Sequence, residues 1–135
     1  MKHTHRFAAA TTIVLGLAAV SYAALAAEEY GEFKTEKTSV GNVLTSPKGM
    51  TLYTYDKDTN GMSECTGSCA KTWLPVHAKK SDKPVGDLTI IKRSDGTLQW
   101  ADKGKPLYTY VKDKKAGEVN GNGMGGTWHA VMAEQ

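Results

Sequence analysis

The sequence predicts an all-β, mainly antiparallel fold, a small pseudo-symmetric sandwich or barrel-like domain built from two tandem repeats of about 55 residues. Three observations predict it. The segment LYTYDKD at residues 52–58 returns as LYTYVKD at residues 107–113. Short runs of alternating aromatic, β-branched and apolar residues lie between turn-forming residues. After the N-terminal leader, no stretch has the periodicity of a long amphipathic helix.

The first 26 residues are predicted to be a secretory signal peptide. Lys2 and Arg6 give the leader a positive start, residues 7–27 carry no charge, and a small-x-small triplet ends at Ala26. An uncleaved membrane anchor is the alternative, because about 20 apolar residues can span a bilayer. Cleavage near Ala26 would leave residues 27–135 as a single mature domain, periplasmic or secreted, with no stable membrane insertion.

The duplication extends well beyond the two heptads. At a fixed offset of 55 residues the copies align without a gap, and they cover about residues 38–80 and 93–135. The pair Thr-Trp ending at Trp73 recurs at Trp128, at the same offset. Two copies are too few for a solenoid. We therefore expect two similar halves, packed face to face or side by side around one core.

Each copy contains a short predicted strand, at residues 52–55 and 107–110, flanked by turn residues. Strand geometry places Tyr53 and Tyr55 on one face and the residues between them on the other. A short helical turn is expected at residues 68–72.

A β-hairpin is predicted between the two Tyr-containing strands, from residues 88–92 to residues 97–100 around a Ser-Asp-Gly turn. Residues 77–86 are polar and are interpreted as the connection between the repeats. Residues 116–126 are Gly-rich and are expected to form a surface loop.

The residues that recur in both copies have two interpretations. In the first, they pack: the tyrosines cover the core with their hydroxyls at its rim, the aspartates accept backbone N–H bonds in the following turns, and each tryptophan fills the core of its own half. In the second, they form a ligand platform with aspartate as the polar anchor. The motif residues are Tyr53, Tyr55, Asp58, Trp73, Tyr108, Tyr110, Asp113 and Trp128. Trp100 lies outside the strict match, and exposure there would favour a ligand or partner surface.

Cys65 and Cys69 are the only cysteines, and they form a C-x-x-x-C motif that the second copy lacks. In an oxidising compartment this spacing predicts a short disulfide, provided that the segment turns. The alternative is a thiol-redox pair or a Cu(I) site, because soft sulfur ligands select Cu(I). The candidate metal ligands are Cys65, Cys69, Met62, Met124, His77 and His129.

Charge and motifs exclude several functional classes. The chain has 17 basic and 14 acidic side chains, and two of the basic ones lie in the leader, so the remainder is nearly neutral. It has no basic patch for nucleic acid or anionic lipid. None of the common catalytic or phosphate-binding motifs is present. We expect a protein that is not an enzyme and has no assigned cofactor, with copper as the one alternative.

The tandem pattern G-x-x-L-Y-T-Y-x-x-D, followed by S-x-C-x-G-x-C-A-x-x-W in the first copy and G-x-W-x-x-V in the second, resembles the bacterial secreted repeat family of unknown function. Members are often labelled predicted lipoproteins with a Tyr-x4-Asp motif. Both Tyr53 to Asp58 and Tyr108 to Asp113 fit that motif. This sequence departs from the label in having no lipid-attachment cysteine near the cleavage site, which argues against a lipid anchor and favours the periplasm in a Gram-negative host.

These observations predict an exported periplasmic or envelope-associated protein that binds a ligand. The partner would be a small molecule or an envelope protein, and nucleic acid is not expected. The alternative function is a copper-binding or thiol-redox protein that uses the C-x-x-x-C loop.

Overall fold

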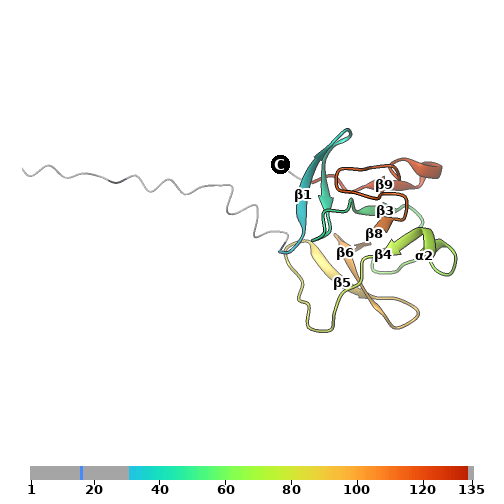
Figure 1. The fold of residues 1–135 in the computed structure, drawn as a ribbon. Coiled ribbons are helices and arrows are strands. Elements are labelled where there is room, and N and C mark those ends of the chain that lie inside the picture. Colours follow the sequence, from blue (N-terminus) through green and yellow to red (C-terminus); the bar gives the residue numbers. More distant parts are fainter. Residues whose placement is uncertain (1–15, 17–30, 134–135) are drawn as a thin grey trace, which may run out of the picture.

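The computed structural model describes residue 16 and residues 31–133, and almost all of its regular structure is antiparallel strand (Figure 1). The predicted cleavage site at Ala26 lies outside the described residues. The strands are β1 Lys34–Thr38, β2 Gly41–Thr45, β3 Tyr53–Tyr55, β4 Trp73–Pro75, β5 Leu88–Lys92, β6 Leu98–Asp102, β7 Lys105–Pro106, β8 Tyr108–Tyr110 and β9 Trp128–Ala130. In the described part of the chain, no helix is long and apolar enough to cross a membrane.

The central sheet has four strands in the order β4-β8-β3-β9, so strands from the first and second repeats alternate across it. The two Tyr-containing strands meet at its middle, where Tyr53 lies opposite Tyr108. The Trp73 strand of the first repeat pairs with the second repeat's β8, and the Trp128 strand of the second repeat pairs with the first repeat's β3. The halves are therefore interleaved rather than packed face to face or side by side.

Backbone hydrogen bonds follow the same crossed pattern at the 55-residue offset. The Val131 N–H donates to the Leu52 carbonyl at 2.9 Å, and the Val76 N–H donates to the Leu107 carbonyl at 3.0 Å. Each bond joins the end of one repeat to the start of the other repeat's Tyr-containing strand. In the central sheet, the strands of each repeat therefore find their hydrogen-bonding partners in the other repeat.

Two smaller sheets accompany the central one. β1 pairs with β2, and β5, β6 and β7 form a three-stranded antiparallel sheet. The all-β, mainly antiparallel prediction and the predicted hairpin are confirmed, and the second hairpin strand begins one residue later than predicted, at Leu98. Among the described residues the sheets stay open and separate, so the barrel-like alternative does not apply.

The predicted helical turn is present as α2, Cys69–Thr72, directly before β4. The Gly-rich loop contains a short 3-10 turn, η1, Met124–Gly126, which leads into β9. Both turns precede a tryptophan, so the two repeats deliver Trp73 and Trp128 to the sheet in the same way.

The alternation of side chains along the central strands divides the interior into two apolar clusters. The aromatic cluster consists of Val43, Tyr53, Cys65, Trp73, Tyr108, Tyr110, Trp128 and Ala130. The second cluster consists of Phe33, Leu44, Leu52, Leu88, Trp100 and Leu107. Tyr53 and its neighbour Leu52 are fully buried in different clusters, as expected for successive residues on a strand.

Candidate functional site

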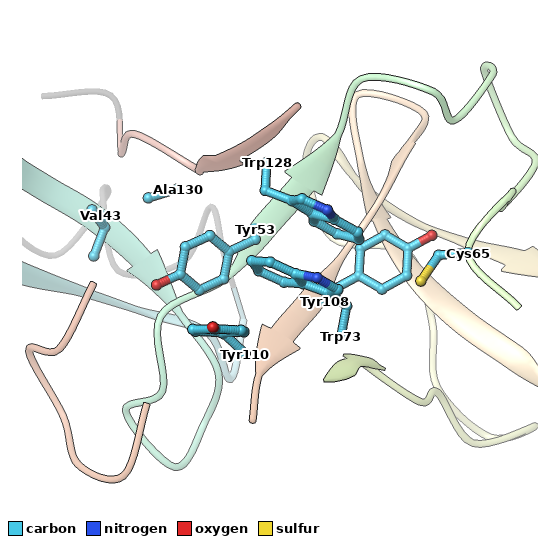
Figure 2. Close-up of a cluster of buried hydrophobic side chains, with 8 residues drawn as sticks. All are labelled: Val43, Tyr53, Cys65, Trp73, Tyr108, Tyr110, Trp128 and Ala130. Atoms are coloured by element: carbon cyan, nitrogen blue, oxygen red, sulfur yellow. The ribbon is translucent and has the colours of Figure 1, made fainter. Parts of the chain in front are cut away.

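The aromatic motif residues form one stack that contains rings from both repeats. The Trp73 and Trp128 rings lie face to face, with centroids 3.8 Å apart and an interplanar angle of 3° (Figure 2). Tyr55 stacks on Trp128 at 4.2 Å, and Tyr110 stacks on Trp73 at 4.4 Å. The expectation that each tryptophan fills the core of its own half is wrong, because crossed strand pairing brings both indoles into one shared core.

The first tyrosine of each motif donates a hydrogen bond to the aspartate of the other repeat. The Tyr53 hydroxyl donates to Asp113 Oδ2 and the Tyr108 hydroxyl donates to Asp58 Oδ2, both at 2.6 Å. The second oxygen of each carboxylate accepts a backbone N–H of its own repeat, from Glu64 at 2.7 Å and from Asn120 at 3.0 Å. The predicted backbone bonds to the aspartates are thus present, while the tyrosine hydroxyls lie inside the core rather than at its rim.

Burial is the largest influence on the pKa values of Tyr53, Tyr108 and Asp58. It raises the pKa of Tyr53 and Tyr108 well above the ordinary tyrosine value, and the hydrogen bond to the carboxylate acts in the same direction. Burial also raises the pKa of Asp58, against the opposing effect of its hydrogen bonds from Tyr108 and the Glu64 N–H. Both tyrosines therefore stay protonated and serve as hydrogen-bond donors at neutral pH.

A buried cation lies at one end of this network. Arg93 is 6% exposed and donates from Nη1 to Ser63 Oγ at 2.8 Å and to Gln99 Oε1 at 2.7 Å. Ser63 Oγ lies 2.7 Å from the Tyr108 hydroxyl, which donates to Asp58. This chain connects a guanidinium to a carboxylate through two hydroxyls. Sequence reasoning missed Arg93 and Gln99, because neither belongs to the repeated motif.

Six of the eight motif residues are buried in the interior of the fold, and the other two, Tyr55 and Asp58, are half-buried. Tyr53 and Tyr108 are fully buried, and both tryptophans are nearly so. Faces of the indole rings are covered by other rings of the same stack. A ligand platform needs open aromatic faces, and each indole is stacked on both sides by other rings, so neither indole offers a ligand an open face.

Cys65 and Cys69 form the predicted disulfide, with their Cα atoms 5.2 Å apart. Cys65 is fully buried beside Tyr108, as Figure 2 shows, so the bridge fixes its loop against the aromatic cluster. Of the other candidate metal ligands, Met62 and Met124 are exposed. His129 Nε2 lies 2.8 Å from Asp56 Oδ2, and His77 Nδ1 lies 3.3 Å from the Leu98 carbonyl. Among the described residues, no group of three or more His, Cys, Asp and Glu side chains is placed to hold a metal ion.

A cleft of about 410 Å³ lies between the N-terminal residues of the described chain and the inter-repeat connection. Its volume falls in the range typical of small-molecule sites, about 300–1,000 Å³. Its apolar lining consists of Phe33, Pro47, Val76, Val85 and Trp100. Trp100 is 9% exposed and packs edge to face against Phe33, with centroids 5.2 Å apart. The cleft therefore opens onto the second apolar cluster.

The remaining lining is polar and comes mostly from the inter-repeat connection. These residues are Gly31, Glu32, His77, Lys79, Ser81, Asp82 and Lys83. A turn shapes this rim: the Lys79 N–H donates to Asp82 Oδ2 at 2.8 Å, and the Asp82 N–H donates to the Lys79 carbonyl at 3.0 Å. Among the described residues, neither Lys79 nor Lys83 forms an ion pair with a carboxylate.

Sequence reasoning interpreted residues 77–86 only as a connection and missed the cleft. The available signal was weak, since a polar segment with one Pro-Val pair is typical of any surface loop. Trp100 was recognised as lying outside the strict repeat, but only the fold shows that it lines a cleft together with this loop. The nearly buried ring is not the exposed tryptophan that would have indicated a partner surface.

A family model described as a secreted repeat of unknown function matches residues 34–77 and residues 89–132. The two matches are offset by the same 55 residues as the internal repeat, and together they cover more than half of the chain. No curated protein and no solved structure matches the chain. Most of the polar cleft lining lies before the first match or between the two, in segments that the repeat pattern does not define. The chain belongs to the family of secreted repeats of unknown function.

Proposed function

We propose that this protein is exported to the bacterial envelope and binds a small molecule in the cleft between Phe33, Trp100 and the inter-repeat connection. The observation that carries the proposal is the cleft itself, with a volume of about 410 Å³, an apolar aromatic floor and a polar rim. This combination is typical of ligand sites, where apolar surface supplies affinity and a few polar groups orient the ligand.

The repeated residues and the inter-repeat connection have different roles, and this difference supports the proposal. The repeated residues are used for packing and for the crossed Tyr–Asp bonds, which make a fixed framework. The cleft instead uses a segment that occurs once in the chain. Binding residues are often carried on loops that a rigid scaffold positions.

Export is supported by the family, whose members are described as secreted. The predicted leader, with cleavage near Ala26, is consistent with delivery to the periplasm or beyond the cell. Mass spectrometry of protein isolated from the periplasm and the medium would test both export and cleavage near Ala26. Protein that is found in the cytoplasm and still carries its complete N-terminus would contradict the proposed export.

Binding in the cleft can be tested with phenylnaphthylamine, a neutral dye that becomes fluorescent in apolar sites. We expect saturable binding of one dye per chain. Ser81→Trp, which adds a large ring to the exposed rim of the cleft, should abolish it. Ser94→Trp makes the same change at an exposed turn outside the cleft lining and should bind like the unmodified protein. Equal binding by both variants, or no binding by the unmodified protein, would refute the proposal.

A further inference from the structure

We infer that the ligand of this cleft is a small organic anion, in which an apolar body of about ring size carries an acidic group. This inference rests on the proposed function and adds the chemical class of the ligand. The apolar floor would hold the body, and the ammonium groups of Lys79 and Lys83 would hold the acid.

The floor favours a flat apolar group. Phe33 and Trp100 meet at an interplanar angle of 77°, and both belong to the second cluster, so their positions are set by the core behind them. Val76, packed against the same cluster, extends this surface. Burial of a ring against such a surface is favourable, and aromatic contacts gain further from edge-to-face geometry.

The two lysines on the rim favour a ligand with an acidic group. Lys79 and Lys83 both line the cleft, four residues apart, and neither is neutralised by an ion pair among the described residues. Asp82 lies between them, but its Oδ2 accepts the backbone N–H of Lys79 within the turn. Two ammonium groups are therefore available to a ligand, while the Asp82 carboxylate keeps its charge but is fixed in position by its own turn.

Glu32 is the opposing charge that must be considered. It lines the cleft from the N-terminal side, and its carboxylate forms no ion pair among the described residues. With Asp82 included, the lining carries two positive and two negative side chains, so its net charge does not distinguish an anion from a cation. The anion is favoured by placement: Lys79 and Lys83 stand four residues apart on one segment and can reach the same acidic group, whereas Asp82 is held by its own turn and Glu32 lines the cleft from the N-terminal side. Both carboxylates would limit the affinity of the anion.

Two dyes with the same ring skeleton separate the contribution of the acid from that of the rings. Anilinonaphthalene sulfonate is phenylnaphthylamine with an added sulfonate. We expect the sulfonate dye to bind roughly three- to tenfold more tightly at low salt, as two partly exposed cations would allow. The advantage should shrink as added salt screens the lysines. A sulfonate dye that binds no more tightly than the neutral dye would overturn the inference.

Matched lysine variants locate the effect. In the double variant Lys79→Gln/Lys83→Gln, the sulfonate dye should lose its advantage while the neutral dye binds as before. The control Lys57→Gln/Lys112→Gln removes two exposed lysines outside the cleft lining and should leave both dyes unchanged. Glu32→Gln should tighten the sulfonate dye. An advantage that survives the cleft double variant would overturn the inference even if the neutral dye still binds, whereas failure of the neutral dye would overturn the proposed function itself.

Discussion

At the scale of single residues, the conspicuous feature is the exchange of hydrogen bonds between repeats. Asp113 is 5% exposed and receives the Tyr53 hydroxyl at 2.6 Å. A buried carboxylate that loses a donor keeps the full penalty of its desolvation. The tyrosine hydroxyl is therefore important to stability beyond the packing of its ring.

Tyr53→Phe is expected to lower the free energy of unfolding by about 1.5–3 kcal/mol, because it removes a hydrogen bond to a charged group and leaves Asp113 with its backbone donor alone. Denaturant titration would measure the change. Tyr55→Phe is the matched control two residues away, because the Tyr55 hydroxyl makes no hydrogen bond among the described residues and the Phe ring keeps the stack on Trp128. The two variants should differ clearly, and equal stabilities would contradict the role assigned to the crossed bond.

Asp58 gives stability a pH dependence of unusual sign for a carboxylate. Burial raises the pKa of Asp58 above its ordinary value of 3.8, so the folded state holds this proton more tightly than the unfolded state. The stability from this group is fully present below pH 3.8 and is lost as the pH rises through the raised pKa. The unfolding free energy of the unmodified protein relative to Asp58→Asn should therefore fall across that window.

Asp95 provides the comparison. Hydrogen bonds from the Thr97 hydroxyl and backbone N–H lower the pKa of Asp95 in the folded state. The stability that Asp95 contributes is therefore absent at low pH and increases as the carboxyl ionises. The unfolding free energy of the unmodified protein relative to Asp95→Asn, measured over the same pH range, should therefore rise with pH, opposite to the trend for Asp58. Parallel trends for the two aspartates would rule out the assigned effect of burial on Asp58.

At the scale of elements, the disulfide loop is where the copies differ most. Cys65 and Cys69 stand where the second copy has Asn120 and Met124, and the second copy still delivers Trp128 to the sheet through η1. The bridge therefore stabilises one loop and is not needed for the repeat to fold.

Replacement of both cysteines by alanine should lower the free energy of unfolding by about 2 kcal/mol, the loop-closure value for so short a loop, plus the packing lost at buried Cys65. The free energy of unfolding of the reduced but unmodified protein measures the loss of the disulfide alone. The further difference to the double alanine variant measures the packing of the sulfur atoms. Dye binding in the cleft should be unchanged. Tight Cu(I) uptake by the reduced protein would instead favour the metal alternative.

Several elements were predictable because their signals are local. The 88–92 strand and its hairpin follow from alternation and a Ser-Asp-Gly turn, and the short helix before Trp73 lies within the segment 68–72 where a helical turn was expected. Strand order was not predictable, because Tyr53 could pair with any strand of suitable pattern and the copies are similar enough to exchange partners. The cleft depends on that order, since Val76, Trp100 and Phe33 meet only in the folded chain.

At the scale of the whole molecule, the alternating sheet makes the two repeats interdependent. In the part of the chain that the structure describes, β3 pairs with β8 and β9, both from the second repeat, and β4 pairs with β8. Neither half alone can form the stack of Trp73 on Trp128. The repeat was visible in the sequence, but the interleaving was not, because side-by-side halves would leave the same spacing.

A protease site inserted between Lys80 and Ser81 tests this interdependence. After cleavage, the two fragments should still elute as one species, and the near-ultraviolet circular dichroism of the stacked tryptophans should persist, because the central sheet joins them. Each fragment purified in denaturant and diluted alone should stay unfolded, and mixing should restore the signal. Fragments that fold separately would show that the repeats are independent domains.

Crossed pairing also bears on how such a chain can arise. A gene encoding one repeat would yield a molecule whose tryptophan strand finds its tyrosine strand only on a second molecule. Duplication and fusion convert that encounter into an intramolecular one, at an effective concentration set by residues 77–86. After fusion, Tyr53 and Asp113 must still form their hydrogen bond between the two repeats, so neither can change freely. Positions such as Cys65 and Asn120 have no such constraint and can diverge. The tether itself, no longer constrained by symmetry, becomes the natural place for a new specificity to evolve.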